Sequence, residues 1–354
     1  MDILPCILVE RQNGEKLHQW LINNVLLNRS IKICSENNWL VFPIIRNLKE
    51  NEIEYLKKKI PIIRFEKRMM ELKKIKKPKD LFMALKSLIP KNLHNLIPKS
   101  FDIIGKLVII EISEELKEYE EVIGKKILTL HPSLSSVFKK VESVQGEFRL
   151  RDVYLIAGDK NTETIHKENK CNYELDIKKV YFSPRLATEH DRVSALVQKD
   201  EIILDMFAGI GPFSILIAKR KQAQVWAVDI NPAATYYLNR NIILNKVDNF
   251  IRVFKGDARE VLKKMPKQNF NRIIMNLPSK SSEFIDITTQ VLKKDSIIHY
   301  YQFVSESDYP VKFLEDLKKI FQRYGRSIKE ILNIRKVRAY APYIWQIGVD
   351  ILVK

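Results

Sequence analysis

Four polar residues stand directly after four apolar stretches in the second half of this 354-residue chain. They are Asp205, Asp229, Asp257 and Asn276, and the apolar stretches before them have the composition of buried parallel strands. The carboxyl ends of parallel strands meet at one edge of a sheet, where ligands bind in such folds. A carboxylate there accepts hydrogen bonds from ribose hydroxyls or from an adenine amine. The series therefore predicts a nucleoside site.

Two glycines, Gly209 and Gly211, follow the first of these strands, and Asp229 comes 20 residues after Gly209. Glycine permits a sharp turn and leaves space for a ligand. A purely structural turn, a dinucleotide site and an S-adenosylmethionine site are the three interpretations. The dinucleotide motif is poorly matched, because Pro212 follows Gly211 directly and Ser214 stands where a third glycine is expected. The strand-end acids favour S-adenosyl-L-methionine as cofactor, since that ligand carries no phosphate and needs an acid for its ribose.

Alternating strand and helix patterns surround these residues and predict the elements that position them. The predicted fold class is α/β, with a Rossmann-like class I methyltransferase domain over residues 179–354. Its later predicted elements are a strand at 296–301, a helix at 308–324 and two strands at 330–337 and 345–353. A helix at 186–197 leads into the cofactor strand.

Two smaller domains are predicted before the catalytic one. Residues 1–65 are predicted to form a small α/β domain, whose first strand lies near 3–10 and whose last strand lies at 60–65. A basic linker follows at 66–79, where seven basic residues accompany two acids. Residues 80–178 predict an α+β domain that binds RNA, with a helical segment at 80–98 and paired strands after residue 100. The last of these strands are predicted at 136–141, 146–155, 163–168 and 172–177.

The overall charge points to a polyanionic partner. The formal net charge is +18, and clustered Lys and Arg side chains release counterions from a phosphate backbone. A lysine-rich surface that serves only solubility is the alternative. The three cysteines, Cys6, Cys34 and Cys171, have no metal-ligand spacing and predict a reducing, cytoplasmic location without a metal site. No signal peptide and no apolar stretch of bilayer length is seen, so no membrane association is expected.

Several short motifs together resemble one enzyme family, and the similarity runs from about residue 100 to the end. They are Gly146-Glu-Phe-Arg-Leu-Arg151, Thr164-Ile-His-Lys-Glu-Asn169, Val180-Tyr-Phe-Ser-Pro-Arg185, Asp205-Met-Phe-Ala-Gly-Ile-Gly-Pro-Phe213, Asp229-Ile-Asn-Pro232, Met275-Asn-Leu-Pro278 and Ile298-His-Tyr-Tyr301. In this order they resemble the archaeal and eukaryotic tRNA guanine-37 N1-methyltransferase family. The resemblance implies a monomer of three domains that binds tRNA and S-adenosylmethionine.

The resemblance also implies the catalytic residues Arg149, Glu189 and Asn276. Removal of the N1 proton from guanine places negative charge on O6, so a base and a donor to O6 are both required. Glu189 is expected to be the base in a dry pocket, and Arg149 the donor to O6. Asn276 and Pro278 are expected to hold the guanine edge. A surface role for Glu189 at a helix start, and a phosphate contact for Arg149, are the alternatives.

The predicted cofactor site extends beyond the four strand ends and the two glycines. Its complete set is Arg185, Asp205, Phe207, Gly209, Gly211, Asp229, Ile230, Asp257, Ala258 and Asn276. Two rival functions remain at this stage. One is a wyosine-pathway transferase that transfers an aminocarboxypropyl group or methylates a tricyclic guanine derivative. The other is a catalytically silent RNA-binding protein that retains the fold.

Overall fold

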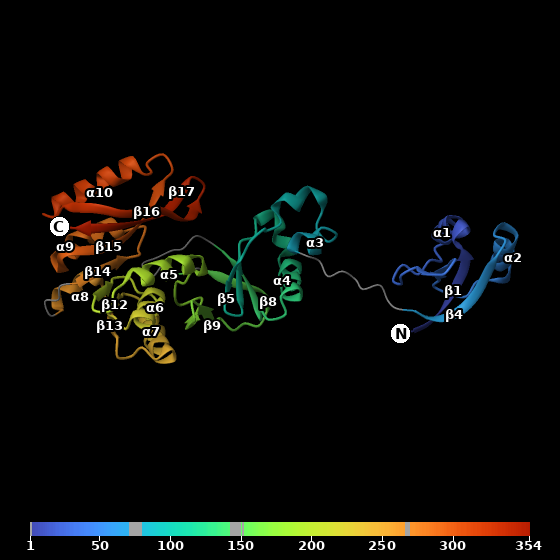
Figure 1. The fold of residues 1–354 in the computed structure, drawn as a ribbon, viewed down its shortest axis with the longest axis horizontal. Helices are drawn as coiled ribbons and strands as arrows, with labels where there is room; N and C mark the ends of the chain where they lie inside the picture. The colour runs from blue at the N-terminus through green and yellow to red at the C-terminus, as the bar shows by residue number, and fades with distance from the viewer. Residues whose placement is uncertain (1, 71–79, 142–149, 151, 266–269) are drawn as a thin grey trace. The chain divides into compact units, whose positions relative to one another are not determined.

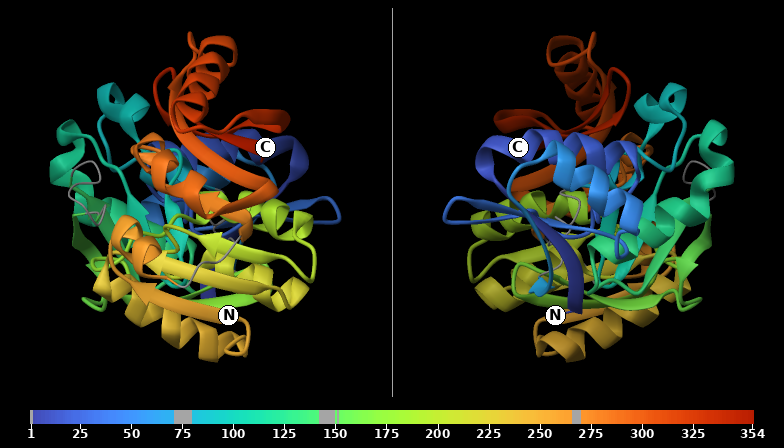
Figure 2. Two further views of the ribbon diagram at one scale, coloured as in Figure 1. Left: turned by 90° about the vertical axis from the view of Figure 1, so that its left-hand side faces the viewer. Right: turned by 90° about the vertical axis from the view of Figure 1, so that its right-hand side faces the viewer.

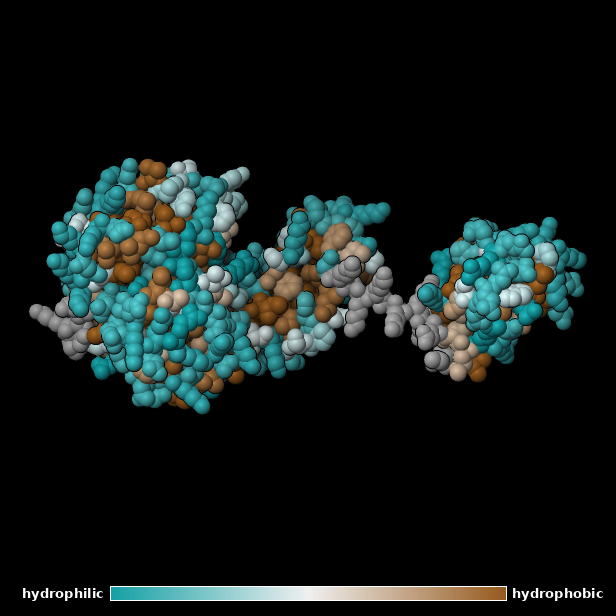
Figure 3. Space-filling model, viewed as in Figure 1, coloured by the Kyte–Doolittle hydropathy of each residue, from teal (hydrophilic) through white to brown (hydrophobic). Residues whose placement is uncertain are grey.

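The computed structural model describes residues 2–70, 80–141, 150, 152–265 and 270–354. The chain divides into two compact units, Met1–Lys77 and Pro78–Lys354. Among the described residues, none of the helices combines the length and the apolar composition needed to cross a bilayer. Hydrophilic side chains cover much of the visible surface of the larger unit, with smaller apolar patches between them (Figure 3).

The first unit is an antiparallel sheet with strand order β2-β3-β1-β4 and two helices. The central strand β1 has period-two burial: Ile7 and Val9 pack with helix residues Leu17 and Leu56, whereas Leu8 belongs to the cluster on the other face. The elements are β1 Asp2–Glu10, α1 Gly14–Asn23, β2 Cys34–Glu36, β3 Trp39–Pro43, α2 Glu50–Lys59 and β4 Ile63–Met70.

Strand β4 corrects the predicted start of the linker at residue 66. The strand continues to Met70, which pairs with Asp2 of β1. Its charged residues are compatible with a strand because β4 lies at the edge of the sheet, where charged side chains reach solvent. Residues 66–70 therefore belong to the sheet, and the rest of the predicted linker, residues 71–79, lies outside the described residues.

The second unit begins with a four-stranded sheet in the order β5-β6-β7-β8, in which β6 and β7 are parallel. Helix α4 packs on this sheet through Ile123 and Ile127. The single helical segment predicted at 80–98 is wrong: Pro90 separates helix α3 from a 3-10 turn at Lys91–Leu96. The elements are α3 Leu81–Leu85, β5 Asp102–Ile104, β6 Leu107–Ile110, α4 Glu120–Leu130, β7 Ser136–Lys140 and β8 Val153–Gly158.

The predicted doubly wound sheet is present and has seven strands in the order β13-β12-β11-β14-β15-β17-β16. The first five strands run parallel to one another, and β17 runs antiparallel to both β15 and β16. The strands are β11 Ile202–Asp205, β12 Gln224–Asp229, β13 Ile251–Lys255, β14 Phe270–Met275, β15 Leu292–Ser305, β16 Ile328–Ala341 and β17 Ile344–Val353.

Helices cover both faces of this sheet, as Figures 1 and 2 show. On one face Val193, Phe213 and Tyr237 enter a core that continues into the four-stranded sheet. On the other face Leu262 and Phe313 are part of a second core. The helices are α5 Ala187–Leu196, α6 Pro212–Lys221, α7 Pro232–Asn245, α8 Ala258–Lys264, α9 Ile285–Val291 and α10 Val311–Arg323.

A hairpin, β9 Glu163–Glu168 and β10 Cys171–Asp176, connects the two sheets. Two asparagines of α7 hold it in place: Asn241 Oδ1 accepts the Glu174 N–H at 2.7 Å, and Asn245 Oδ1 accepts the Asn172 N–H at 2.9 Å. The hairpin is thus hydrogen-bonded to a helix of the larger sheet, and the two sheets share a core within one compact unit. A functional division of this unit at residue 178 stays a prediction.

Candidate active site

A cavity of about 330 Å³ opens at the carboxyl edge of the parallel strands, within the size range of small-molecule sites. Residues that follow β11, β12, β13 and β14 all line it. The predicted residues that line the cavity are Phe207, Gly209, Asp229, Ile230, Asp257, Ala258 and Asn276. The topology of the sheet therefore brings Asp229, Asp257 and Asn276 together at one edge, but Asp205, the fourth predicted strand-end residue, does not line the cavity.

Asp229 is the acid whose environment best suits a ribose. Its Oδ2 accepts the backbone N–H of Gly209 at 2.7 Å, and its Oδ1 accepts that of Asn231 at 2.9 Å. Burial raises the pKa of Asp229 above its ordinary value, although both of these N–H groups oppose the shift. Each oxygen retains a lone pair, and the carboxylate lines the cavity. The arrangement leaves acceptors for two hydroxyls.

The turn at Gly209 requires glycine for its backbone and its space. Gly209 has φ +56°, and the nearest atom to a Cβ built there is the Tyr181 carbonyl oxygen at 3.9 Å. The space beside its Cα is thus open to a ligand. Together with the Asp229 carboxylate, this turn fits a nucleoside. Gly211 has φ +92°, and a Cβ there would meet Leu238 at 2.4 Å. Gly211 does not line the cavity; it lets the start of α6 pack closely on α7.

Asp257 and the apolar residues enclose the rest of the cavity. The Asp257 side chain caps α8 by accepting the Arg259 N–H at 2.7 Å. Phe207 meets Phe284 edge to face, with 5.0 Å between ring centroids. Arg259, whose guanidinium lies over the Phe284 ring, also lines the cavity and was not predicted. The cavity therefore offers apolar rings beside a carboxylate, which suits a nucleobase and its amine.

The remaining predicted cofactor residues do not line the cavity. Asp205 is fully buried, and its Oδ2 accepts the Ser214 hydroxyl at 2.6 Å. Burial raises the pKa of Asp205 to about 7. Arg185 donates to Asp102 at 2.6 Å. Pro278, which was predicted to hold the guanine edge, is buried, and its carbonyl accepts the Phe303 N–H at 3.0 Å. Arg149 lies outside the described residues.

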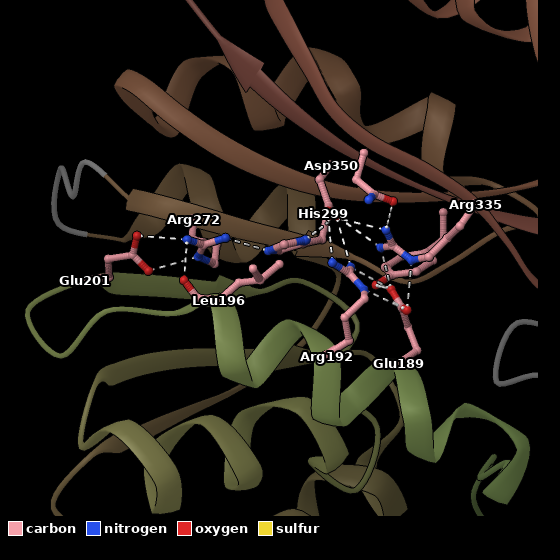
Figure 4. A network of polar contacts seen from close by, with 10 residues as sticks. Glu189, Arg192, Leu196, Glu201, Arg272, His299, Arg335 and Asp350 are labelled. Atoms are coloured by element: carbon pink, nitrogen blue, oxygen red, sulfur yellow. Dashed lines mark hydrogen bonds and ion pairs between the residues drawn. The ribbon is translucent and has the colours of Figure 1, made fainter.

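Glu189 lies in a buried ionic network and not on the cavity wall (Figure 4). Only 5% of it is exposed, so the surface role weighed from the sequence is wrong. Its carboxylate accepts hydrogen bonds from both Arg192 and Arg335 at 2.8–3.0 Å and from the Tyr301 hydroxyl at 2.5 Å. Glu189 is therefore buried, and two guanidinium groups that the sequence did not predict face its carboxylate.

The network continues through Asp350 and His299 (Figure 4). Asp350 accepts from Arg192 at 2.7 Å and from Arg335 at 3.2 Å, and His299 Nδ1 lies 2.6 Å from Asp350. On the other side, His299 Nε2 lies 2.8 Å from a guanidinium nitrogen of Arg272. Since arginine only donates, His299 Nε2 must accept and Nδ1 must carry the proton. Burial lowers the pKa of His299, which agrees with a neutral ring.

The charge of Asp350 is compensated by these neighbours. Burial opposes its ionisation, but the hydrogen bond from the neutral His299 ring and the charge of Arg192 bring its pKa below the ordinary value. Burial and the adjacent Glu189 carboxylate raise the pKa of Tyr301 well above its usual value. Tyr301 therefore remains a donor to Glu189.

The doubly wound sheet, its antiparallel end and its nucleoside-type cavity define a class I, Rossmann-like methyltransferase domain. Family models agree with this class over most of the chain. Residues 164–329 match the TRM5/TYW2 methyltransferase domain, residues 81–162 the TYW2 N-terminal domain, and residues 6–53 the tRNA methyltransferase 5 N-terminal domain.

Known proteins resemble the whole chain. The tRNA (guanine(37)-N(1))-methyltransferase Trm5b of Pyrococcus abyssi is 39% identical over 347 residues, which are 98% of each chain. The solved complex of aTrm5 and tRNALeu matches with a TM-score of 0.71 and 35% identity, over 99% of both chains. Trm5 of Methanocaldococcus jannaschii in complex with adenosine matches with a TM-score of 0.64 and 32% identity, over 99% of both chains. The chain belongs to the TRM5 family of tRNA (guanine-37-N1)-methyltransferases.

The sequence did not reveal the partners of Glu189 and Asn276. Arg335, Arg338, Gln346 and Asp350 all come from β16 and β17, at least 140 residues after Glu189. Alternation along β17 was the available signal: Gln346 and Asp350 are polar residues four apart that share one face of a mostly buried strand. Buried polar residues need partners, but the sequence does not say which.

Proposed function

We propose that this chain transfers a methyl group from S-adenosyl-L-methionine to N1 of guanine 37 in tRNA. The observation that carries the proposal is the cavity in which Gly209, Asp229, Asp257 and Asn276 meet. Full-length similarity to enzymes named for this reaction supports the choice of substrate. The formal charge of +18 supports binding to a polyanion.

The residues of the cavity suit binding and orientation of the donor. S-adenosylmethionine would supply an electrophilic methyl group on its sulfonium. We assign its ribose to Asp229 and the turn at Gly209, which leaves space for close approach. We assign its adenine to the part of the cavity between Phe207 and Asp257. The adenosine-bound relative supports a nucleoside ligand for this fold.

Proton removal from N1 is assigned to Glu189. Its carboxylate accepts five hydrogen bonds, so one donor must leave before guanine N1–H can approach. Both arginines have a second partner in Asp350, and Arg335 is the donor best able to move because it lies on the edge strand β16. Arg149 remains the proposed donor to guanine O6, and this assignment depends on the sequence motif.

The second candidate is a wyosine-pathway transferase that uses the same donor. The match of residues 81–162 to the TYW2 N-terminal domain favours it. The match of residues 6–53 to the tRNA methyltransferase 5 N-terminal domain favours the first candidate. We also propose a monomer in the cytoplasm, where the free thiols of Cys6, Cys34 and Cys171 would remain reduced.

Mass spectrometry of nucleosides distinguishes the candidates. Unmodified tRNA transcript is incubated with the full chain and S-adenosylmethionine, and its digested nucleosides are compared with standards. The proposal predicts 1-methylguanosine from position 37 and none from a transcript with adenosine at that position. An aminocarboxypropyl adduct, or a product only from tRNA that carries a tricyclic guanine, would support the second candidate. Tight binding of tRNA without any product would support the silent RNA-binding protein.

A further inference from the structure

A hydrogen-bonded chain leads from β16 to the cavity and ends on Asn276. Arg338 Nε of β16 donates to Gln346 Oε1 of β17 at 2.8 Å, and Gln346 Nε2 donates to Asn276 Oδ1 at 3.1 Å. Arg338 is held at its other nitrogens by the Ser183 hydroxyl at 3.0 Å and the Tyr181 hydroxyl at 2.9 Å. None of these partners belongs to the network around Glu189.

Chemistry fixes the direction of each hydrogen bond in this series. A guanidinium has no acceptor, so the Gln346 atom that faces Arg338 must be the carbonyl oxygen. The other atom of the Gln346 amide must then be the NH2 group, which only donates. Consequently the Asn276 atom facing Gln346 must be its carbonyl oxygen. Gln346 is 0% exposed, so water does not offer it an alternative partner.

This polarity determines what Asn276 presents to a bound molecule. Its Oδ1 is engaged by Gln346, and no described residue accepts a hydrogen bond from its Nδ2. Asn276 lines the cavity, so its NH2 group is the part that is available to a ligand. A ligand atom that meets this group must be an acceptor.

We propose that Arg338 and Gln346 are positioning residues that fix Asn276 as a hydrogen-bond donor to guanine O6. This inference rests on the proposed function. On the reacting edge of guanine, N1 and the exocyclic amine carry protons, and O6 is the acceptor next to N1. Negative charge develops on O6 when the N1 proton leaves, and a donor fixed in advance stabilises that charge without reorganisation. The carbonyl has two lone pairs, so Asn276 and Arg149 can both donate to it.

Gln346→Glu tests the polarity, because glutamate has nearly the same shape and only acceptors. One carboxylate oxygen would accept from Arg338, and the other could accept only from the Asn276 NH2 group. Asn276 would then turn its carbonyl toward the cavity. Loss of one such donor lowers rates by about 10²- to 10³-fold. The single-turnover rate with unmodified tRNA transcript should fall by that factor, while calorimetry shows little change in S-adenosylhomocysteine affinity.

A mutant cycle with Asn276→Ala separates positioning from packing. If Gln346 acts only through Asn276, the double variant should be no slower than Asn276→Ala, within about twofold. A general structural defect would multiply the two losses. Gln302→Glu is the matched control, since Gln302 lies on the neighbouring strand β15 and accepts from the Tyr300 hydroxyl at 2.6 Å. It should keep the wild-type rate.

A wild-type rate for Gln346→Glu, or multiplied losses in the double variant, would overturn the inference. If the buried charge of Gln346→Glu prevents folding, Gln346→Met enters the same cycle. That variant leaves Asn276 free to turn and predicts a smaller loss, again absent in the Asn276→Ala background. A wild-type protein that never methylates guanine would reject the proposed function itself, whereas an active wild type with multiplied losses rejects the positioning alone.

Discussion

Asp205→Asn tests the electrostatics beneath the cavity through the pH dependence of stability. Asp205 is fully buried, and burial raises its pKa from the ordinary 3.8 to about 7. Between these values the folded state holds a proton that the unfolded state has lost. The free energy of unfolding must therefore fall as pH rises toward 7, by about 1.4 kcal/mol per pH unit. From pH 5 to pH 7 the wild type should lose about 2.3 kcal/mol through this group, because the slope falls as the folded carboxyl itself begins to ionise.

The Asp205→Asn variant removes the pH-dependent contribution of this carboxyl to the free energy of unfolding, with little change in side-chain shape. At pH 5 the folded wild type carries a protonated, neutral Asp205 carboxyl, and the amide that replaces it is also neutral and can still accept from the Ser214 hydroxyl. The unfolded wild type is already ionised at this pH, so the variant should be the more stable by about 1.7 kcal/mol. At pH 8 the variant should be the more stable by about 4 kcal/mol, so the difference grows by about 2.6 kcal/mol from pH 5 to pH 8. Urea unfolding of the full chain, with pulse proteolysis to follow the Pro78–Lys354 unit, measures the difference.

The exposed Asp200→Asn substitution is the matched control, and its stability should run parallel to that of the wild type across the same pH range. Subtraction of the variant curve from the wild-type curve cancels the other titrating groups. Parallel curves for wild type and Asp205→Asn, within about 0.5 kcal/mol from pH 5 to pH 8, would refute the reasoning. A wild type that gains stability relative to the variant as pH rises would refute the sign.

Three further predictions address the site and the units. Asp229→Ala removes the acceptors assigned to the ribose. Because each hydrogen bond to a charged group contributes about 1.5–3 kcal/mol, S-adenosylhomocysteine binding measured by calorimetry should weaken at least about 10²-fold. Unchanged affinity would argue against the ribose assignment. Glu189→Gln should lower the single-turnover rate by about 10²- to 10⁴-fold while sparing cofactor affinity, and an unchanged rate would remove Glu189 as the base. Deletion of residues 1–77 should leave cofactor binding intact and reduce tRNA affinity or discrimination. Loss of cofactor binding in that deletion would count against the independence of the two units.

The strand-end site was predictable because a parallel sheet imposes its geometry. Once the stretches ending in Asp205, Asp229 and Asn276 are recognised as parallel strands, their ends must meet at one edge. The sequence did not show which of these side chains reach the cavity and which remain buried beneath it. Asp205 points into the core and bonds Ser214, whereas Asp229 reaches the cavity, and both follow similar apolar stretches. Helix packing beneath the turn decides which acid is covered.

The environment of Glu189 was less predictable because it depends on contacts far apart in the chain. Arg335 and Asp350 reach it from β16 and β17, whose antiparallel pairing sets which side chains share a face. Alternation predicts faces but not register, and this pairing contains several irregularities. The burial of Glu189 agrees with the expected pocket, but its two arginine partners were not predicted.

A crystal structure of the full chain with S-adenosylhomocysteine is the most direct test of the donor site on which the proposed methyl transfer depends. We predict that both ribose hydroxyls lie within hydrogen-bonding distance of the Asp229 carboxylate, with the adenine between Phe207 and Asp257. The sulfur should lie on the side of the cavity lined by Asn276. Electron density for the ligand away from Gly209 and Asp229 would contradict the assignment of this cavity.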